Sequence, residues 1–302
     1  MANPLTIIGV PSSAGAYAPG QERAPAALRA AGLLELLNGY GVATDDHGDV
    51  RGFRWRADKE HPRAMNAPVV ASGAEELSRA VHGAIARDHR VLVLGGDCTT
   101  ELGTVAGALR QHRDVGLLYI DLDTDLNTPD STTDGALDWM GVAPMLAIPD
   151  TVPALVNLGP GTPMLQPDQV MYFLVDNIEP FERDLIDELS VANIRLNEVA
   201  ANPIAAARKA VEWASRFERL LIHLDVDVLD YVDMPLAENT RRNWGLRFAE
   251  LMAALRIVLQ APNWSTLTVC EVNPDHGEAD GSTLRHFASS LAAAIASRDA
   301  QS

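Results

Sequence analysis

A run of alternating carboxylates directly after a short apolar segment is the feature that most restricts what this sequence can fold into. Residues 117–120 read Leu-Leu-Tyr-Ile, and Asp121, Asp123 and Asp125 follow at alternate positions. The apolar residues predict a buried strand, which places the three carboxylates where that strand ends. Like charges at this spacing repel one another and raise one another's pKa unless cations lie among them. The stretch therefore predicts a site for one or two divalent metals.

A second segment repeats this design further along the chain. Residues 220–230 read L-L-I-H-L-D-V-D-V-L-D, so another apolar strand runs into Asp225 and Asp227. Two strands that each end in paired aspartates indicate one shared metal cluster, and a pair of metals is a recognised means of activating water. These residues predict a hydrolase. His223 alternates with Asp225, so its ring either shares the site face or packs behind it.

The remaining sequence predicts an α/β fold. Apolar segments of strand length lie at 5–10, 91–94, 170–175, 193–196 and 267–272, and helical spacing or capping patterns lie at 25–39, 72–87, 99–110, 203–218, 246–259 and 282–295. Short strands separated by helices are typical of a parallel sheet that is covered on both faces and binds ligands at the carboxyl ends of its strands. We expect the Gly95–Cys98 turn, both aspartate clusters and Glu271 at that edge. The Pro- and Gly-rich residues 150–168 predict an irregular segment that could lie over the site.

Charge and composition exclude several classes of partner. The chain has 24 Lys and Arg against 41 Asp and Glu, a net charge of −17, which disfavours binding to nucleic acid or to anionic membranes. No apolar run approaches the roughly 18 residues of a membrane span. Two distant cysteines and no signal segment predict a cytoplasmic protein. With no linker, residues 1–302 predict a single domain, and because little chain follows the last helix we expect a monomer.

Six ordered motifs resemble the ureohydrolase family, and within it the arginases. They are I-I-G-V-P-S-S from residue 7, L-R-A-A-G-L-L from residue 28, G-G-D-C-T-T from residue 95, D-L-D-T-D-L-N-T-P from residue 121, L-D-V-D-V-L-D from residue 224 and E-V-N-P from residue 271. The resemblance implies a three-layer α/β/α fold around a mostly parallel sheet of about eight strands. It also implies a centre of two manganese ions, whose bridging hydroxide attacks the carbon of a guanidino group.

The resemblance also implies roles for individual residues. Asp121 and Asp225 would bridge the two ions. Cys98 and Asp125 would complete the binding of one ion, and Asp123 and Asp227 would complete the binding of the other. Asp125 would pass a proton to the departing amine, and Glu271 would hold the guanidinium. The amino-acid end of the substrate would lie near Asn127, Asp134, Glu179 and Glu182.

Five positions depart from the arginase pattern: two, Asp134 and Ala136, where the family has a serine and an asparagine that contact the substrate's α-carboxylate, and three at the metal centre. Cys98 and Asp123 stand where the family has histidine ligands, and Asp138 stands where it has a histidine proton shuttle. Five aspartates, one thiolate and a hydroxide give −7 against +4 for two divalent ions, so the centre carries −3 instead of the −1 of a two-histidine centre. Such a centre is a weaker Lewis acid, which favours a less basic guanidine. Asp138 could supply the missing acid if burial raised its pKa; the alternative is a solvated loop carboxylate.

This combination resembles the branch of the family that hydrolyses Nω-hydroxy-L-arginine to hydroxyurea and L-ornithine in antibiotic (D-cycloserine) biosynthesis. Arginine and agmatine are alternative substrates, and Asp134 could hold the cation of agmatine. A metal-binding sensor without catalysis is an alternative from another class. The thiolate of Cys98 is a soft ligand, so zinc or iron could compete with manganese. A calcium loop is disfavoured because Leu126 and Thr132 replace its glycine and glutamate.

Overall fold

Eight parallel strands form one sheet at the centre of residues 3–298, the part of the chain that this computed structural model describes. The strands are β1 (Leu5–Gly9), β2 (Thr44–Asp49), β3 (Arg90–Leu94), β4 (Val115–Ile120), β5 (Val170–Val175), β6 (Ala192–Arg195), β7 (Arg219–Asp225) and β8 (Trp264–Cys270). Their order across the sheet is β2-β1-β3-β8-β7-β4-β5-β6, and every neighbouring pair is parallel. The predicted parallel sheet is thus confirmed.

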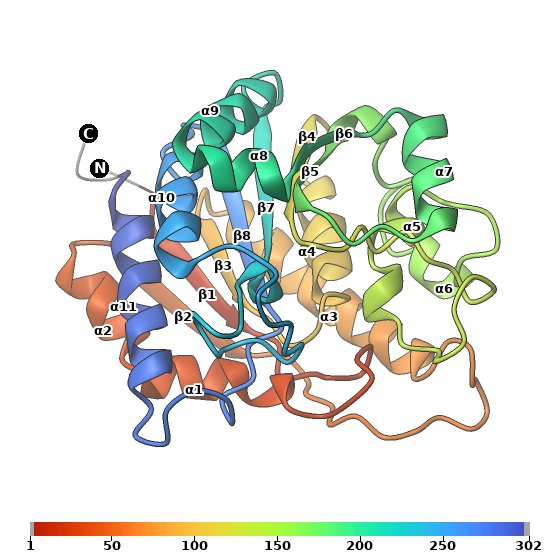
Figure 1. The fold of residues 1–302 in the computed structure, drawn as a ribbon, viewed down its shortest axis with the longest axis horizontal. Coiled ribbons are helices and arrows are strands. Elements are labelled where there is room, and N and C mark those ends of the chain that lie inside the picture. The colour runs from red at the N-terminus through yellow and green to blue at the C-terminus, as the bar shows by residue number, and fades with distance from the viewer. Residues whose placement is uncertain (1–2, 299–302) are drawn as a thin grey trace.

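Helices cover both faces of the sheet (Figure 1). One layer holds α1 (Ala24–Ala30), α2 (Leu33–Gly39), α8 (Leu196–Ala201), α9 (Pro203–Ala214), α10 (Phe248–Val258) and α11 (Ser282–Ala296), and the other holds α3 (Ala67–Ile85), α4 (Thr100–Leu109), α5 (Val142–Met145), α6 (Pro153–Val156) and α7 (Pro180–Leu189). Alternate strand residues supply the two cores: in β3, Leu92 and Leu94 face the first layer, and Val91 and Val93 face the second. This confirms the three-layer α/β/α fold. No helix within residues 3–298 has the length and apolar character that crossing a membrane requires.

The four middle strands, β3, β8, β7 and β4, are neighbours and end side by side. Leu94 of β3 and Leu224 of β7 both pair with Val269 of β8, and Leu224 also pairs with Ile120 of β4. The residues that follow these strands therefore meet at one edge of the sheet. This edge carries the features that were predicted to share it.

The structure differs from the sequence predictions at several helices and strands, and three of the differences have a clear local reason. The predicted helix over 25–39 is broken into α1 and α2, because Gly32 adopts φ +86°. The helix predicted to begin after Ser72 begins at Ala67 instead, with Pro68 in its first turn and Val70 already buried in the core. Strand β2 was not predicted, because its sequence, TDDHGD, has no apolar alternation; it lies at the edge of the sheet.

Residues 150–168 are irregular apart from short α6 and the start of a 3₁₀ turn, as predicted, but they do not line the cavities at the sheet edge. Leu155 and Leu165 of this segment are buried in the core beside α3, and Leu165 donates a backbone hydrogen bond to Met145. The segment packs against the second layer instead of covering the site, because its apolar side chains are buried in the core of that layer.

Candidate metal centre and substrate pocket

The ends of β3, β4 and β7 bring all six predicted metal ligands to one cavity of about 20 Å³. Each of these six residues is at most 8% exposed: Cys98, Asp121, Asp123, Asp125, Asp225 and Asp227. Asp138 and Glu271 line the same cavity. The structure therefore gathers residues that lie far apart in the sequence into one buried acidic cluster.

The repeated Asp-x-Asp pattern has a local structural reason. One oxygen of Asp121 accepts the backbone N–H of Asp123 at 2.8 Å, and one oxygen of Asp225 accepts that of Asp227 at 2.6 Å. Each first aspartate thus stabilises the turn that ends its strand. Its second oxygen is left for the cluster, where Oδ2 of Asp225 accepts a hydrogen bond from Sγ of Cys98 at 3.1 Å.

The carboxylates of this cluster have too few neighbouring cations and hydrogen-bond donors to offset their negative charge. Burial, followed by repulsion from neighbouring carboxylates, raises the pKa of Asp121 well above its usual range. Burial likewise raises the pKa of Asp227 to about 7, although the nearby Arg241 opposes the rise. Oδ2 of Asp121 and Oδ1 of Asp227 are buried and accept no hydrogen bond from residues 3–298. Oxygen atoms of Asp121, Asp123 and Asp227 lie within 4.8 Å of one another, so the donors fit divalent cations.

One histidine lies against the cluster. His223 on β7 is fully buried and stacks on the ring of Tyr119 from β4, with centroids 4.1 Å apart. Its Nδ1 lies 3.4 Å from a carboxylate oxygen of Glu101, and its Nε2 lies 4.0 Å from Oδ2 of Asp121. His223 therefore packs behind Asp121, between two carboxylates. Glu101 was not predicted, because nothing in the sequence of α4 connects it with β7.

Arg241 is a second side chain that the sequence did not reveal. It lies in the loop between β7 and α10, and its side chain is only 12% exposed. Its Nη2 lies 2.7 Å from Oδ2 of Asp123, and its Nη1 lies 3.4 Å from Oδ2 of Asp227. The loop has no recognisable motif, so only the folded chain shows this contact. The guanidinium adds one positive charge that the sequence-based charge count omitted.

A larger cavity of about 350 Å³ adjoins the cluster and shares Asp123, Asp125 and Trp139 with it. All four residues predicted near the amino-acid end of a substrate line this cavity: Asn127, Asp134, Glu179 and Glu182. Trp139 stacks on Tyr17, with ring centroids 6.4 Å apart, so the two rings together form one wall of the small cavity. The pair of cavities has the form of a metal centre at the end of a substrate pocket.

Not all of these side chains are free to meet a ligand. One oxygen of the buried Glu182 accepts the side-chain amide of Asn127 at 2.9 Å, and its other oxygen accepts the backbone N–H of Glu179 at 3.0 Å. Glu182 thus holds the pocket wall and caps α7. Asp134 and Glu179 are exposed, and Glu179 is the N-cap residue of α7, whose side chain takes part in the capping box with Glu182. Of the four, these two carboxylates are the ones that a substrate can reach.

Glu271 and Asp138 complete the inner cavity. Glu271 accepts the backbone N–H of Cys98 at 3.1 Å and the side-chain amide of the buried Gln21 at 2.8 Å, and it adopts φ +64°. Gln21 had no sequence signal. Asp138 is 8% exposed, and burial raises the pKa of its carboxyl well above the usual range. Asp138 is therefore not a solvated loop carboxylate.

Comparisons with known proteins agree with this geometry. The model of the "Arginase family" matches residues 3–297. The arginase of Bacillus subtilis (strain 168) is 28% identical over 290 residues, which cover 95% of this chain and 97% of that protein. Arginase-1 of Mus musculus is 31% identical and covers 91% of this chain and 86% of its own. The solved arginase of Bacillus caldovelox superposes with a TM-score of 0.87 at 27% identity and covers 98% of each chain.

Proposed function

Because the chain belongs to the arginase family, whose members are manganese-dependent hydrolases of C–N bonds, we propose that it hydrolyses Nω-hydroxy-L-arginine to hydroxyurea and L-ornithine. The observation that supports this substrate is the composition of the acidic cluster. The six predicted ligands are one thiol and five carboxyl groups. The imidazole of His223 lies within 4.8 Å of the ligand atoms of Cys98 and Asp121, but it stacks on Tyr119 behind Asp121 and does not line the cavity. We infer that this ligand set suits a substrate whose guanidino group is less basic than that of arginine.

Negative ligands weaken the pull of a metal on bound water. Two manganese ions, when bound by the six cluster side chains, would lower the pKa of water so that it can act as a nucleophile at neutral pH. The sum over ligands, hydroxide and two ions is −3, and it would be −2 even if the guanidinium of Arg241 stayed beside Asp123; both values are more negative than −1. Such a centre activates water less. A guanidine with an electron-withdrawing N-hydroxyl group is less basic and easier to attack in its neutral form.

The side chains around the cluster have distinct parts in the proposed reaction. Glu271 is held by Cys98 and Gln21, and its carboxylate would orient the guanidino nitrogens. Tyr119 donates a hydrogen bond to Oδ2 of Asp125, which fixes that carboxylate while it carries a proton to the departing amine. At the far end of the pocket, Asp134 and Glu179 would receive the substrate's α-ammonium group.

A parallel assay distinguishes the candidate substrates. With manganese-loaded protein we expect Nω-hydroxy-L-arginine to be hydrolysed with a kcat/KM at least about tenfold above that for L-arginine, since each tenfold needs only about 1.4 kcal/mol of barrier. Ornithine with hydroxyurea or urea would be quantified, and putrescine for agmatine. Agmatine is included because the exposed Asp134 could bind its amine. Equal or better use of arginine would contradict the proposal, and preference for hydroxyarginine would also support the antibiotic role that the sequence implies.

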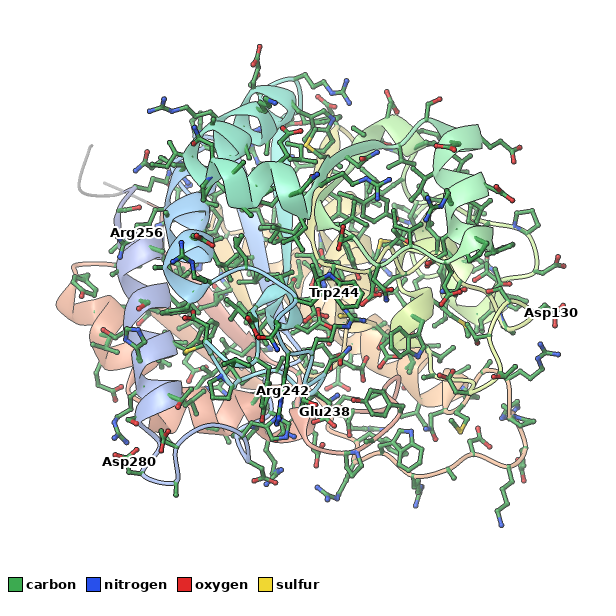
Figure 2. The ribbon with its side chains drawn as sticks, in the orientation of Figure 1. Asp130, Glu238, Arg242, Trp244, Arg256 and Asp280 are labelled. Carbon is green, nitrogen blue, oxygen red and sulfur yellow. The ribbon has the colours of Figure 1, made fainter. Side chains whose placement is uncertain are left out.

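Replacing Asp138 with asparagine tests whether this residue acts as the acid. Because burial raises its pKa, Asp138 keeps its proton to higher pH than an exposed aspartate does, so activity that needs this proton falls on the alkaline side. We expect Asp138→Asn to lower kcat about 10²-fold and to remove that alkaline decline. The control is Asp130→Asn, at a carboxylate that is 76% exposed and lies at the edge of the molecule (Figure 2). An unchanged kcat in Asp138→Asn would exclude the role.

A further inference from the structure

We propose that Arg241 occupies one of the two cation positions of the acidic cluster, so that the protein binds one divalent ion tightly and a second only when Arg241 withdraws. The proposal rests on the proposed function in one respect, the use of two metals by this cluster. The guanidinium of Arg241 thus competes with the second metal ion for the same carboxylates.

The guanidinium lies where a second cation would bind. Its two terminal nitrogens contact Asp123 at 2.7 Å and Asp227 at 3.4 Å. The same two carboxylates, together with Asp121, form one of the groups whose oxygens lie within 4.8 Å of one another. A divalent ion and a guanidinium cannot share these oxygens, because they would occupy the same space and repel each other.

The surrounding loop holds Arg241 in this position. Its backbone carbonyl accepts the N–H of Tyr231 at 2.9 Å, and its guanidinium carbon lies 5.3 Å from the centre of the Trp244 ring. Trp244 is anchored in turn, because its indole N–H donates to Asp176 at 2.7 Å. Figure 2 shows Trp244 of this loop near the middle of the molecule, in the region where β7 ends in Figure 1, with Arg242 and Glu238 below it. Arg241 is thus positioned by its own loop as well as by the carboxylates.

The other half of the cluster has no such cation. Asp225 accepts a hydrogen bond from the thiol of Cys98, and Asp125 accepts one from the hydroxyl of Tyr119. Within residues 3–298, no ion pair joins a lysine or arginine to either carboxylate. A first ion can therefore enter beside Cys98, Asp125 and Asp225 without displacing a positive charge. An ion that binds at the second position must first displace the guanidinium of Arg241, whereas an ion that binds at the first position displaces no cation.

The additional negative charge of Asp123 gives a reason for an arginine at position 241. Asp123 stands at a ligand position where the resembling family has a neutral histidine, and it brings one additional negative charge. Arg241 contacts that carboxylate and cancels the charge. Without the second ion, the guanidinium keeps Asp123 and Asp227 from repelling each other in a buried site. Arg241 is therefore a positioning residue that substitutes for an ion.

Manganese titration of the metal-stripped full-length protein tests the proposal. Calorimetry and elemental analysis would give the dissociation constants and the stoichiometry, and electron paramagnetic resonance would separate isolated from paired Mn²⁺. For the unchanged protein we expect one tight site and a second that is at least about tenfold weaker, with an isolated-ion spectrum at one equivalent. Arg241→Met, which keeps the length of the side chain and removes its charge, is expected to tighten the second site at least about tenfold.

Two further variants make the result specific. Arg241→Lys keeps the charge and is expected to keep the unequal sites, and Arg242→Met removes the exposed neighbouring charge and should change neither constant. Thermal melting would verify that each variant is folded. Two equally tight sites in the unchanged protein, or identical constants in Arg241→Met, would overturn the proposal. These readouts need no substrate, so they are independent of whether hydroxyarginine is hydrolysed.

Discussion

Asp225→Ala is expected to abolish hydrolysis, with a fall in kcat/KM of at least about 10³-fold, because replacing a mere outer partner of a metal ligand already costs about 10- to 100-fold. Asp225 ends β7 at the centre of the cluster and has no substitute. One of its oxygens holds the turn to Asp227 at 2.6 Å, and the other accepts the thiol of Cys98 at 3.1 Å. The alanine variant therefore loses a proposed bridging ligand and the local geometry of a second one.

The measurement is the steady-state rate together with bound manganese per chain. Asp187→Ala is the matched control, since it removes one carboxylate from the exposed face of α7 and should leave both values unchanged. Asp225→Asn separates the two contributions, because an amide can still accept the N–H of Asp227 but carries no charge. Full metal content and full activity in either Asp225 variant would remove this residue from the metal centre.

Glu271→Gln is expected to lower kcat/KM about 10- to 100-fold, since hydrogen bonds to charged groups contribute about 1.5–3 kcal/mol. In the proposed reaction the carboxylate binds the guanidino group, and a neutral amide cannot balance its developing charge. The substitution also disturbs the protein itself, because Cys98 and Gln21 both donate to this carboxylate, and an amide offers one acceptor oxygen in place of two.

Gln21→Leu measures how much of the loss comes from the broken hydrogen bonds within the protein and how much from the lost charge. It removes one donor to Glu271 and leaves the carboxylate charge in place, so we expect a smaller loss than in Glu271→Gln. The measurement is kcat and KM for the best substrate with both variants, with circular dichroism to verify folding. Equal losses in the two variants would mean that Glu271 only holds the turn after β3 and does not bind the substrate.

Much of the sheet and of the acidic cluster could be predicted because both depend on local patterns. Apolar strands such as 117–120 are recognisable from four residues, and the aspartates that follow them are fixed at the strand ends by the chain itself. Strand β2 was missed because its residues, five polar ones and a glycine, pair with one neighbour at the sheet edge and need no apolar face. Helix α7 was missed for a related reason, since Glu182 and Ile186 are its only fully buried residues.

The unpredicted parts of the site depend on tertiary contacts between segments that share no pattern. His223 meets Glu101 only because β7 packs against α4, and Arg241 meets Asp123 only because its loop folds back over the strand ends. Gln21 reaches Glu271 across most of the chain. In each case the residue type alone is compatible with an ordinary core or surface position. The folded chain supplies the information that the sequence pattern lacks.

The position of β8 has a consequence for how the protein is made. It is the last strand to be synthesised, yet it lies between β3 and β7 in the middle of the sheet. Until it emerges, the turn that carries Cys98 and the strands that carry the aspartates belong to two sheet halves with no strand between them. Non-local pairing of this kind is slow, and it leaves the nascent chain with open strand edges. The metal centre is therefore completed late, and a ribosome-bound fragment that lacks β8 carries no intact copy of it.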